Sequence, residues 1–315
     1  MIIYMELTSK WIFLIIICII FIYSYNTANT DIVKDPISRQ YEYIQHYLLK
    51  DSSLAQSKKP IMWIHIDYEQ NSRNWLDFNS RNTFNLNQPY IYLTLKSIID
   101  KCGESFNICI IDDSTFKKII PGWLIDFKYI SKPIKPHIRQ LALCKVLYLY
   151  GGINIPPTTI CTNDLASLYK KDMFVGEFPQ NNTLSPSPKI IGCPKNCPKM
   201  KEFIEYLEII NSNDFTSAFD FIEKDRVWII NKVKENYILC IDGFTIGTKD
   251  KNNSIVTIDS LISEKTPDLS DNALCVVVDE NELLKRTKYN WFCRLSPEQV
   301  LNSNTSIGTL LLNFQ

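Results

Sequence analysis

Apolar residues fill the segment from Leu141 to Tyr150, in which a single lysine interrupts them. This pattern predicts a helix that is buried nearly all round rather than amphipathic. Gly151-Gly152 then fits the end of a helix, because glycine accepts a left-handed closing position and a tight reversal. The apolar residues 153–155 predict a short strand, which Pro156 ends because proline cannot donate to a ladder. Residues after this strand would lie where open α/β sheets bind ligands.

The same alternation of apolar strand and helix recurs before this segment. Residues 61–66 and 106–111 predict two further buried strands, with helices at 72–84 and 88–100 between them. Strands that alternate with helices predict an α/β fold with a mainly parallel sheet flanked by helices. The pattern weakens after residue 165. There we expect strands at 173–177 and 237–242, helices at 199–210 and 215–233, and a proline-rich loop at 179–198.

Residues 284–295 interleave basic and aromatic side chains. They fit a terminal strand that packs its aromatic rings on the core. A lid that contacts a sugar or an anion is the alternative, because aromatic faces stack on sugars and arginine binds phosphate. We favour the strand.

Polar residues follow two of the expected strands. His65 and Asp67 come after the first, and Asp112 and Asp113 come directly after another. Either aspartate could bind a ligand or cap a helix at 114–120, and His65 could equally be a hydrogen-bonded core residue. Arg139 lies in the first turn of the apolar helix, where a cation is unfavourable to the helix dipole. We therefore expect it to face solvent or to meet an anion.

The stretch LYLYGGIN, residues 147–154, resembles the glycosyltransferases with a GT-A-like fold in the capsular-polysaccharide-synthesis and mannosyltransferase-like group. In that group the corresponding turn and strand lead to an Asp-x-Asp pair, which holds a divalent cation (Mn or Mg) and the donor diphosphate. This chain has Pro156 and Thr158 at the two positions. The Ser-Asp pair and the arginine that usually precede the turn fall at Arg139, Gln140 and Leu143, and these also differ.

The resemblance implies a GT-A-like domain over residues 59–315 that binds a nucleotide-sugar donor and a glycan or glycoprotein acceptor. The donor-binding candidates are strand-end and helix residues, namely His65, Asp67, Asp112, Asp113, Arg139 and Thr158. No metal site is expected, because Pro156 and Thr158 replace the Asp-x-Asp carboxylates and hard cations prefer carboxylate oxygens. Arg139, Lys135 or His137 would then offset the charge of the diphosphate.

Two alternatives to an active hexosyltransferase-like enzyme stay open. The chain could be an inactive glycosyltransferase-like scaffold, since fold does not carry function with it. It could also be a structural membrane protein. The residues alone assign no catalytic group.

The N-terminal residues predict a membrane segment. Lys10 precedes an apolar run at 11–25, which is short for a spanning helix of roughly 20 residues. We expect an uncleaved signal anchor with residues 1–10 in the cytosol and a stem at 26–58, and a cleaved signal peptide is the alternative. Either arrangement places the main domain in the lumen or outside the cell. There the sequons at Asn181, Asn252 and Asn304 would be glycosylated.

Composition narrows the class of partner. The formal net charge is zero, so the chain lacks the basic excess of a nucleic-acid binder. Ten cysteines are consistent with an oxidising compartment. Cys193 and Cys197 are the closest pair, and they fit a stapled loop or, less well, a zinc site. Abundant asparagine, isoleucine and lysine are typical of AT-rich genomes and are similar to the composition of proteins of large DNA viruses.

Overall fold

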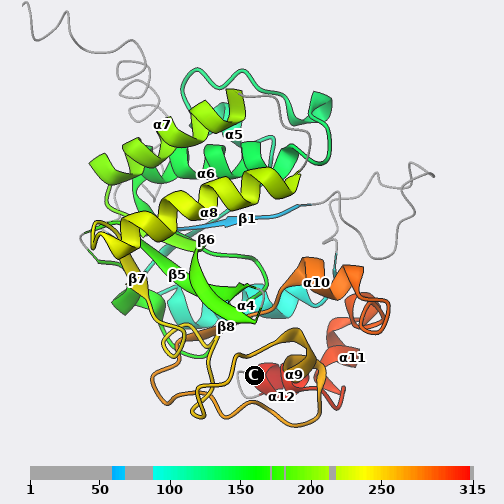
Figure 1. Cartoon of the computed structure of the whole chain (residues 1–315). Helices are drawn as coiled ribbons and strands as arrows, with labels where there is room; N and C mark the ends of the chain where they lie inside the picture. The colour runs from blue at the N-terminus through cyan, green and yellow to red at the C-terminus, as the bar shows by residue number, and fades with distance from the viewer. Residues whose placement is uncertain (1–58, 68–87, 171, 181, 213–217, 313–315) are drawn as a thin grey trace, which may run out of the picture. The chain divides into compact units, whose positions relative to one another are not determined.

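The structure is a computed structural model, and it describes residues 59–67, 88–170, 172–180, 182–212 and 218–312 (Figure 1). These residues belong to one compact unit, Gln56–Gln315. The expected membrane segment, stem and helix at 72–84 lie outside the described residues. Among the described helices, none is both long enough and apolar enough to span a membrane.

A six-stranded sheet forms the centre of this unit, in the order β2-β1-β3-β6-β5-β7. Its strands are β1 (Ile61–His65), β2 (Asn107–Ile111), β3 (Gly152–Asn154), β5 (Phe174–Gln180), β6 (Thr183–Cys193) and β7 (Leu239–Ile241). β6 is antiparallel to β3 and β5, and the other three pairings are parallel. Five of the six strands therefore point the same way, which confirms the predicted mainly parallel α/β sheet. A second sheet pairs β4 (Thr159–Cys161) with β8 (Cys275–Val277).

Helices cover both faces of the large sheet (Figure 1). On one face lie α6 (Lys135–Tyr150), α7 (Pro198–Ser212) and α8 (Ala218–Lys234), and α6 packs against α7. On the other face lies α4 (Ile91–Cys102), which packs against β4. Shorter helices complete the unit: α5 (Phe116–Ile119), α9 (Ile258–Ile262), α10 (Glu280–Lys285), α11 (Pro297–Leu301), α12 (Ser306–Leu312), and the 3-10 turns η3 (Phe127–Tyr129), η4 (Leu165–Leu168) and η5 (Phe292–Arg294).

The turn from α6 into β3 explains its two glycines. No residue of α6 after Pro136 is fully exposed, as the apolar pattern predicts. Gly151 then adopts φ 73° and ψ −174°, a combination that is essentially restricted to glycine rather than the left-handed helical one expected. Gly152 has φ 109°, and a Cβ there would overlap the carbonyl oxygen of Ile61. The indole Nε1 of Trp63 donates to the carbonyl oxygen of Gly151 at 2.9 Å. The turn is thus pressed against β1 and hydrogen-bonded to it.

Two predictions about the second half were wrong. Residues 183–193 form strand β6 instead of a loop. Pro186 pairs with Glu177 of β5, and Pro188 lies in the irregularity between the pairs Gly176–Ser187 and Val175–Ile191. Strand β3 reaches only Ile191 to Cys193, so the missing N–H groups interrupt no ladder on that side. Residues 284–295 contain the end of α10 and the turn η5 rather than a strand. The expected packing of aromatic rings on the core is confirmed for Phe292, which is fully buried.

Candidate functional site

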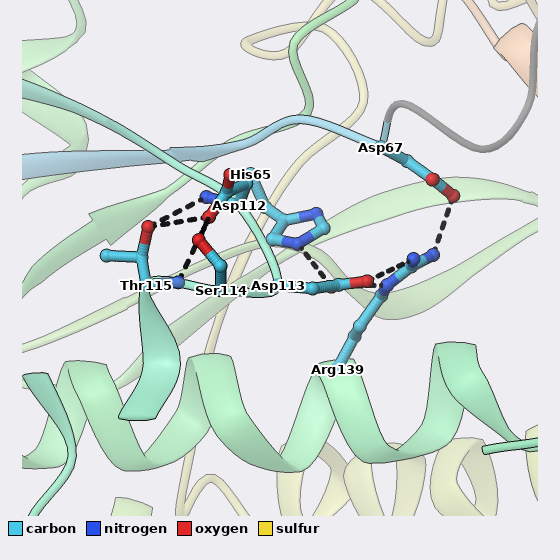
Figure 2. Close-up of polar contacts among 7 residues, drawn as sticks. All are labelled: His65, Asp67, Asp112, Asp113, Ser114, Thr115 and Arg139. Atoms are coloured by element: carbon cyan, nitrogen blue, oxygen red, sulfur yellow. Dashed lines mark hydrogen bonds and ion pairs between the residues drawn. The ribbon is translucent and has the colours of Figure 1, made fainter. Parts of the chain in front are cut away.

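Arg139 joins the ends of β1 and β2 through two carboxylates (Figure 2). Its Nε and Nη2 donate to Oδ1 and Oδ2 of Asp113 at 2.7 and 2.6 Å, and its Nη1 donates to Oδ2 of Asp67 at 2.6 Å. The three side chains are largely buried, with 11% of Arg139, 15% of Asp67 and 23% of Asp113 exposed. Of the two expectations for Arg139, solvent or an anion, the second is confirmed. The anions are the carboxylates of Asp113 and Asp67.

His65 extends this network from β1. Its Nε2 lies 2.9 Å from Oδ1 of Asp113, and its ring stacks on Phe116 at 5.5 Å and 4°. Burial alone would raise the pKa of Asp113. The hydrogen bonds from His65 and Arg139, together with the arginine charge, outweigh burial and lower that pKa to about 2. Asp113 is thus held as an anion between two basic side chains.

Asp112 forms different contacts from those of Asp113. Its Oδ1 accepts from the backbone N–H of Thr115 at 3.0 Å and from the hydroxyls of Ser114 and Thr115 at 2.8 Å each (Figure 2). These bonds order the turn that leads into α5. The sequence left open whether either aspartate caps a helix. In the structure Asp112 closes the turn before α5, whose N-cap is Thr115 without a side-chain cap, and Asp113 forms the ion pair.

Asp67, at one end of the network, lies beside the point where the chain reverses direction across the sheet. From β1 the chain passes through α4 on one face to reach β2, and from β2 it passes through α6 on the other face to reach β3. In open α/β sheets, ligands bind outside the carboxyl ends of the two strands that flank such a reversal. Here those strands are β1 and β3. Asp67 follows β1, and the turn at Pro156 to Thr158 follows β3.

The turn after β3 does not fit the divalent cation that the resemblance implies. Pro156 has no side-chain ligand atom, and Thr158 is 1% exposed and offers a hydroxyl instead of a carboxylate. Its backbone carbonyl accepts from the N–H of Val278 at 3.1 Å, which ties this turn to the end of β8. In the part of the chain that is described, no three His, Cys, Asp or Glu side chains are grouped so that they could hold a metal ion.

A lysine and two acidic residues occupy this edge, and sequence reasoning did not find them. Ile191 of β6 pairs with Asn154, the last residue of β3. Lys189 comes two residues before Ile191, and because β6 is antiparallel to β3, Lys189 lies beyond the carboxyl end of β3. Its Nζ contacts Oδ2 of Asp279 at 2.6 Å. Asp279 also accepts from the N–H of Glu282 at the start of α10. The signal was available in the position of Asp279 and Glu280 directly after an apolar strand.

Glu280 is the one of these residues with an unsatisfied atom. Its Oε2 is buried, and no residue that the structure describes forms a hydrogen bond with it. Burial raises its pKa to about 7, and the negative charges of Asp67 and Asp279 add to this, outweighing Lys189 and Arg139. The charges of Asp67 and Asp279 therefore both influence the ionisation of Glu280.

The other expected cations are placed less favourably for a diphosphate. Lys135 is 7% exposed and His137 is 3% exposed. Burial lowers the pKa of His137 to about 4, so its imidazole is neutral at physiological pH. Neither side chain presents an exposed positive charge to a diphosphate, whereas Lys189, whose side chain is 40% exposed, does.

No family model matches the chain, and no curated protein matches it. Several solved structures are similar to it, and two of them are glycosyltransferases. One is the PaToxG glycosyltransferase, at 16% identity and a TM-score of 0.33, over 63% of this chain and 80% of that one. The other is a glycosyltransferase involved in the glycosylation of the major capsid of PBCV-1, at 8% identity and a TM-score of 0.39, over 71% and 96%. These similarities are distant, so the functional argument rests on the geometry of the site.

Proposed function

We propose that the chain is a glycosyltransferase that binds a nucleotide-sugar donor outside the carboxyl ends of β1 and β3. The observation that carries the proposal is the reversal of the chain between α4 and α6, because this topology places a ligand there. The α6–Gly151–Gly152–β3 turn, which resembles that of sugar-nucleotide enzymes, leads to the same edge. Asp67 and Thr158 flank it, and they remain donor-binding candidates.

In this proposal, Lys189 offsets the charge of the diphosphate. Arg139 already donates to two carboxylates, so its charge is matched within the protein. Lys189 is more exposed, and its anionic contact among the described residues is Asp279, which a diphosphate oxygen can replace. A lysine binds phosphate as a point charge, so this contact needs no metal ion. Asp113 and His65 serve the site by holding Arg139 and Asp67 in place.

A thermal-unfolding experiment on the 315-residue chain tests the proposal. A panel of nucleotide sugars is added, first with manganese and then with EDTA. A ligand at about 100 times its Kd adds roughly 2.7 kcal/mol of stability, which gives a clear rise in Tm. We expect one donor to stabilise the protein in EDTA as well as in manganese.

A matched pair of variants makes this test specific. Lys189→Ala should remove most of the donor-dependent rise in Tm. Lys251→Ala should keep it, because Lys251 is an exposed lysine that pairs with Asp268 and Asp271 instead. The absence of a shift with every donor, in folded protein, would contradict the proposal and favour the inactive scaffold.

We also propose that residues 11–25 anchor the protein in a membrane, with the glycosyltransferase domain in the lumen. The apolar run after Lys10 supports this arrangement. Resistance of the protein to alkaline extraction from membranes, together with a mass loss on deglycosylation, is the expected result. Release into the soluble fraction would contradict the anchor.

A further inference from the structure

Two cysteines from different elements meet in the core where α4 packs against β4. Cys102 is the last residue of α4, and Cys161 is the last residue of β4. Their Sγ atoms are 4.0 Å apart, and both side chains are fully buried. The structure holds them as two thiols. Neither the Arg139 network nor the proposed donor contacts give these thiols a function.

Hydrogen bonds on both sides of the two thiols hold the same segments together. The hydroxyl of Ser97, on α4, accepts from the N–H of Cys161 at 3.1 Å. Just after α4, the hydroxyl of Ser105 donates to the carboxylate of Asp164, which follows β4. The helix end and the strand end are therefore fixed against each other before and after Cys102.

A third cysteine, Cys275, is the competing partner for Cys161. The two residues are paired across the β4–β8 ladder, so their side chains lie on the same face of that sheet. However, Sγ of Cys275 donates to the carbonyl oxygen of Ile246 at 3.9 Å, whereas the sulfur that Cys161 contacts is that of Cys102. Among the described residues, these cysteines do not form a group that could hold a metal ion. The geometry thus favours Cys102 as the partner of Cys161.

We propose that Cys102 and Cys161 are joined by a disulfide in the mature protein. The oxidant is a thiol–disulfide oxidoreductase, the class of protein that the lumen provides. One cysteine thiolate attacks the disulfide of the oxidant and forms a mixed disulfide, and the second thiolate then displaces the oxidant from the chain. The oxidant leaves as a dithiol that carries both electrons and both thiol protons.

The burial of the pair determines when the bond forms. The sulfurs must close from 4.0 Å to about 2 Å, the length of a disulfide bond. Rotation of one cysteine side chain supplies this movement, because its sulfur shifts by more than this between staggered rotamers. Both sulfurs are fully buried once α4 packs on β4, so an oxidant protein reaches them only before that packing is complete. The bond therefore forms during folding and is shielded from reductants afterwards.

The loop that this bond closes contains the edge where we place the donor. Its two ends are 59 positions apart, and β2, α6 and β3 lie between them. Helix α4 also contacts the turn after β3, where the hydroxyl of Thr94 donates to the carbonyl oxygen of Pro157 at 2.6 Å. Because closing a long loop restricts the unfolded chain, the disulfide stabilises the fold. It also fastens α4 to the segment that carries this turn.

Peptide mapping of the 315-residue chain tests the assignment. The chain is refolded with reduced and oxidised glutathione, which here supplies the oxidant, and the remaining thiols are blocked with iodoacetamide. Trypsin cleaves after Lys101 and Glu-C protease cleaves after Glu104, so the digest separates Cys102 from Cys109. We expect a linked peptide pair that contains Cys102 and Cys161 and that separates into its two parts on reduction.

Thermal unfolding measures what the bond contributes. The wild-type Tm should be about 5–10 °C lower when the chain is refolded in dithiothreitol instead of glutathione. Cys102→Ala should lose most of this difference between the two conditions. Cys109→Ala is the matched control, because Cys109 is a neighbouring cysteine on β2 outside the pair, and it should keep the difference. Cys275→Ala should also keep it. Each variant is compared with itself, so the effect of the lost side chain cancels.

The contrary outcomes are distinct. A link between Cys161 and Cys275, or free thiols at both Cys102 and Cys161 in folded protein from the glutathione buffer, would overturn the proposal. A Tm difference in Cys102→Ala as large as in the wild type would overturn it too. Where a variant does not fold, the wild-type peptide map decides. Neither measurement involves a nucleotide sugar, so the result is independent of the proposed glycosyltransferase function.

Discussion

Arg139 and Asp113 form a two-point ion pair, in which Nε and Nη2 of the guanidinium meet the two oxygens of one carboxylate. The third contact of the guanidinium, to Asp67, makes Arg139 the link between the ends of β1 and β2. The planar fork of arginine fits this geometry, and a lysine ammonium cannot reproduce it.

Replacing Arg139 should therefore destabilise the fold strongly. Arg139→Ala leaves two largely buried carboxylates without their counter-ion, and we expect a loss of about 2–4 kcal/mol in the free energy of unfolding. Arg139→Lys should recover only part of it. Urea denaturation measures both. Arg286→Ala is the control, because its ion pairs with Asp259 and Glu282 are exposed and are worth less than about 1 kcal/mol. Equal losses at the two arginines would contradict the network.

The ion pair should also make the protein sensitive to acid. The pKa of Asp113 in the folded chain is lowered to about 2 from an ordinary 3.8, so its stabilising effect is complete above about pH 4. As the pH falls toward 2, folded Asp113 takes up its proton and this stabilisation is lost. Asp113→Asn should show a lower Tm at pH 6 and a shallower decline between pH 4 and pH 2. Parallel declines in both proteins would show that Asp113 is not the titrating group.

Asp225 on α8 should act in the opposite direction. It is 5% exposed, and its Oδ2 accepts from Nε2 of Gln140 at 2.7 Å. Its Oδ1 has no partner within the described part of the chain. Burial raises its pKa to about 7 from 3.8, so the folded state holds a proton that the unfolded state releases. This contribution to stability is therefore lost as pH rises from about 4 to 7.

Asp225→Asn keeps an acceptor for Gln140 and removes the charge. We expect the variant to be at least as stable as the wild type at pH 8, with a flatter dependence of Tm on pH between 5 and 8. Thermal unfolding across this range measures it. Asp172→Asn is the control, since its carboxylate is 41% exposed and pairs with Lys199. A wild-type slope in Asp225→Asn would contradict the assignment.

Gly152→Ala should be among the most damaging small substitutions in the chain. The Cβ of an alanine at position 152 would overlap the carbonyl oxygen of Ile61. The residue also has φ 109°, so backbone strain adds to the steric collision. We expect a loss of more than about 3 kcal/mol in the free energy of unfolding.

Gly122→Ala gives the matched comparison for Gly152→Ala. Gly122 also has a positive φ, 71°, but a Cβ there meets nothing within 4 Å. Gly122→Ala should lower the free energy of unfolding by only about 1–2 kcal/mol, the strain of a left-handed alanine. Similar losses at the two glycines, measured in urea, would show that the approach of the turn to β1 is looser than described.

The sequence predicted the first half of the fold well because its apolar runs are continuous. Segments 61–66 and 141–155 become β1, α6 and β3 within a residue or two at most boundaries, apart from the early start of α6 at Lys135. The second half was predicted less well, because partners distant in the chain decide it. β6 exists through its pairing with β5 and β3 despite two prolines, and no local pattern indicates that pairing.

The site was predicted in part for the same reason. His65, Asp67, Asp113 and Arg139 were each chosen by their place at a strand end or helix start, and the structure brings them together. Lys189 and Glu280 were missed, because they reach the site from β6 and from the end of β8. The apolar run before Asp279 marks a strand end, but the antiparallel register of β6 and the bond between Val278 and Thr158 are needed to bring both residues to this edge. The membrane segment and the nucleotide-sugar specificity stay predictions.

The hydrogen bond from Trp63 to Gly151 has a consequence for how the chain reaches its folded state. It joins residues 88 positions apart, and β1 pairs in parallel with both β2 and β3. Contacts between such distant residues need large loops to close first, which slows folding. The edge that carries Asp67 and Thr158 can therefore assemble only after α6 and β3 have been synthesised. A nascent chain that ends before Tyr150 leaves β1 without one neighbouring strand, and we expect it to need chaperones during synthesis.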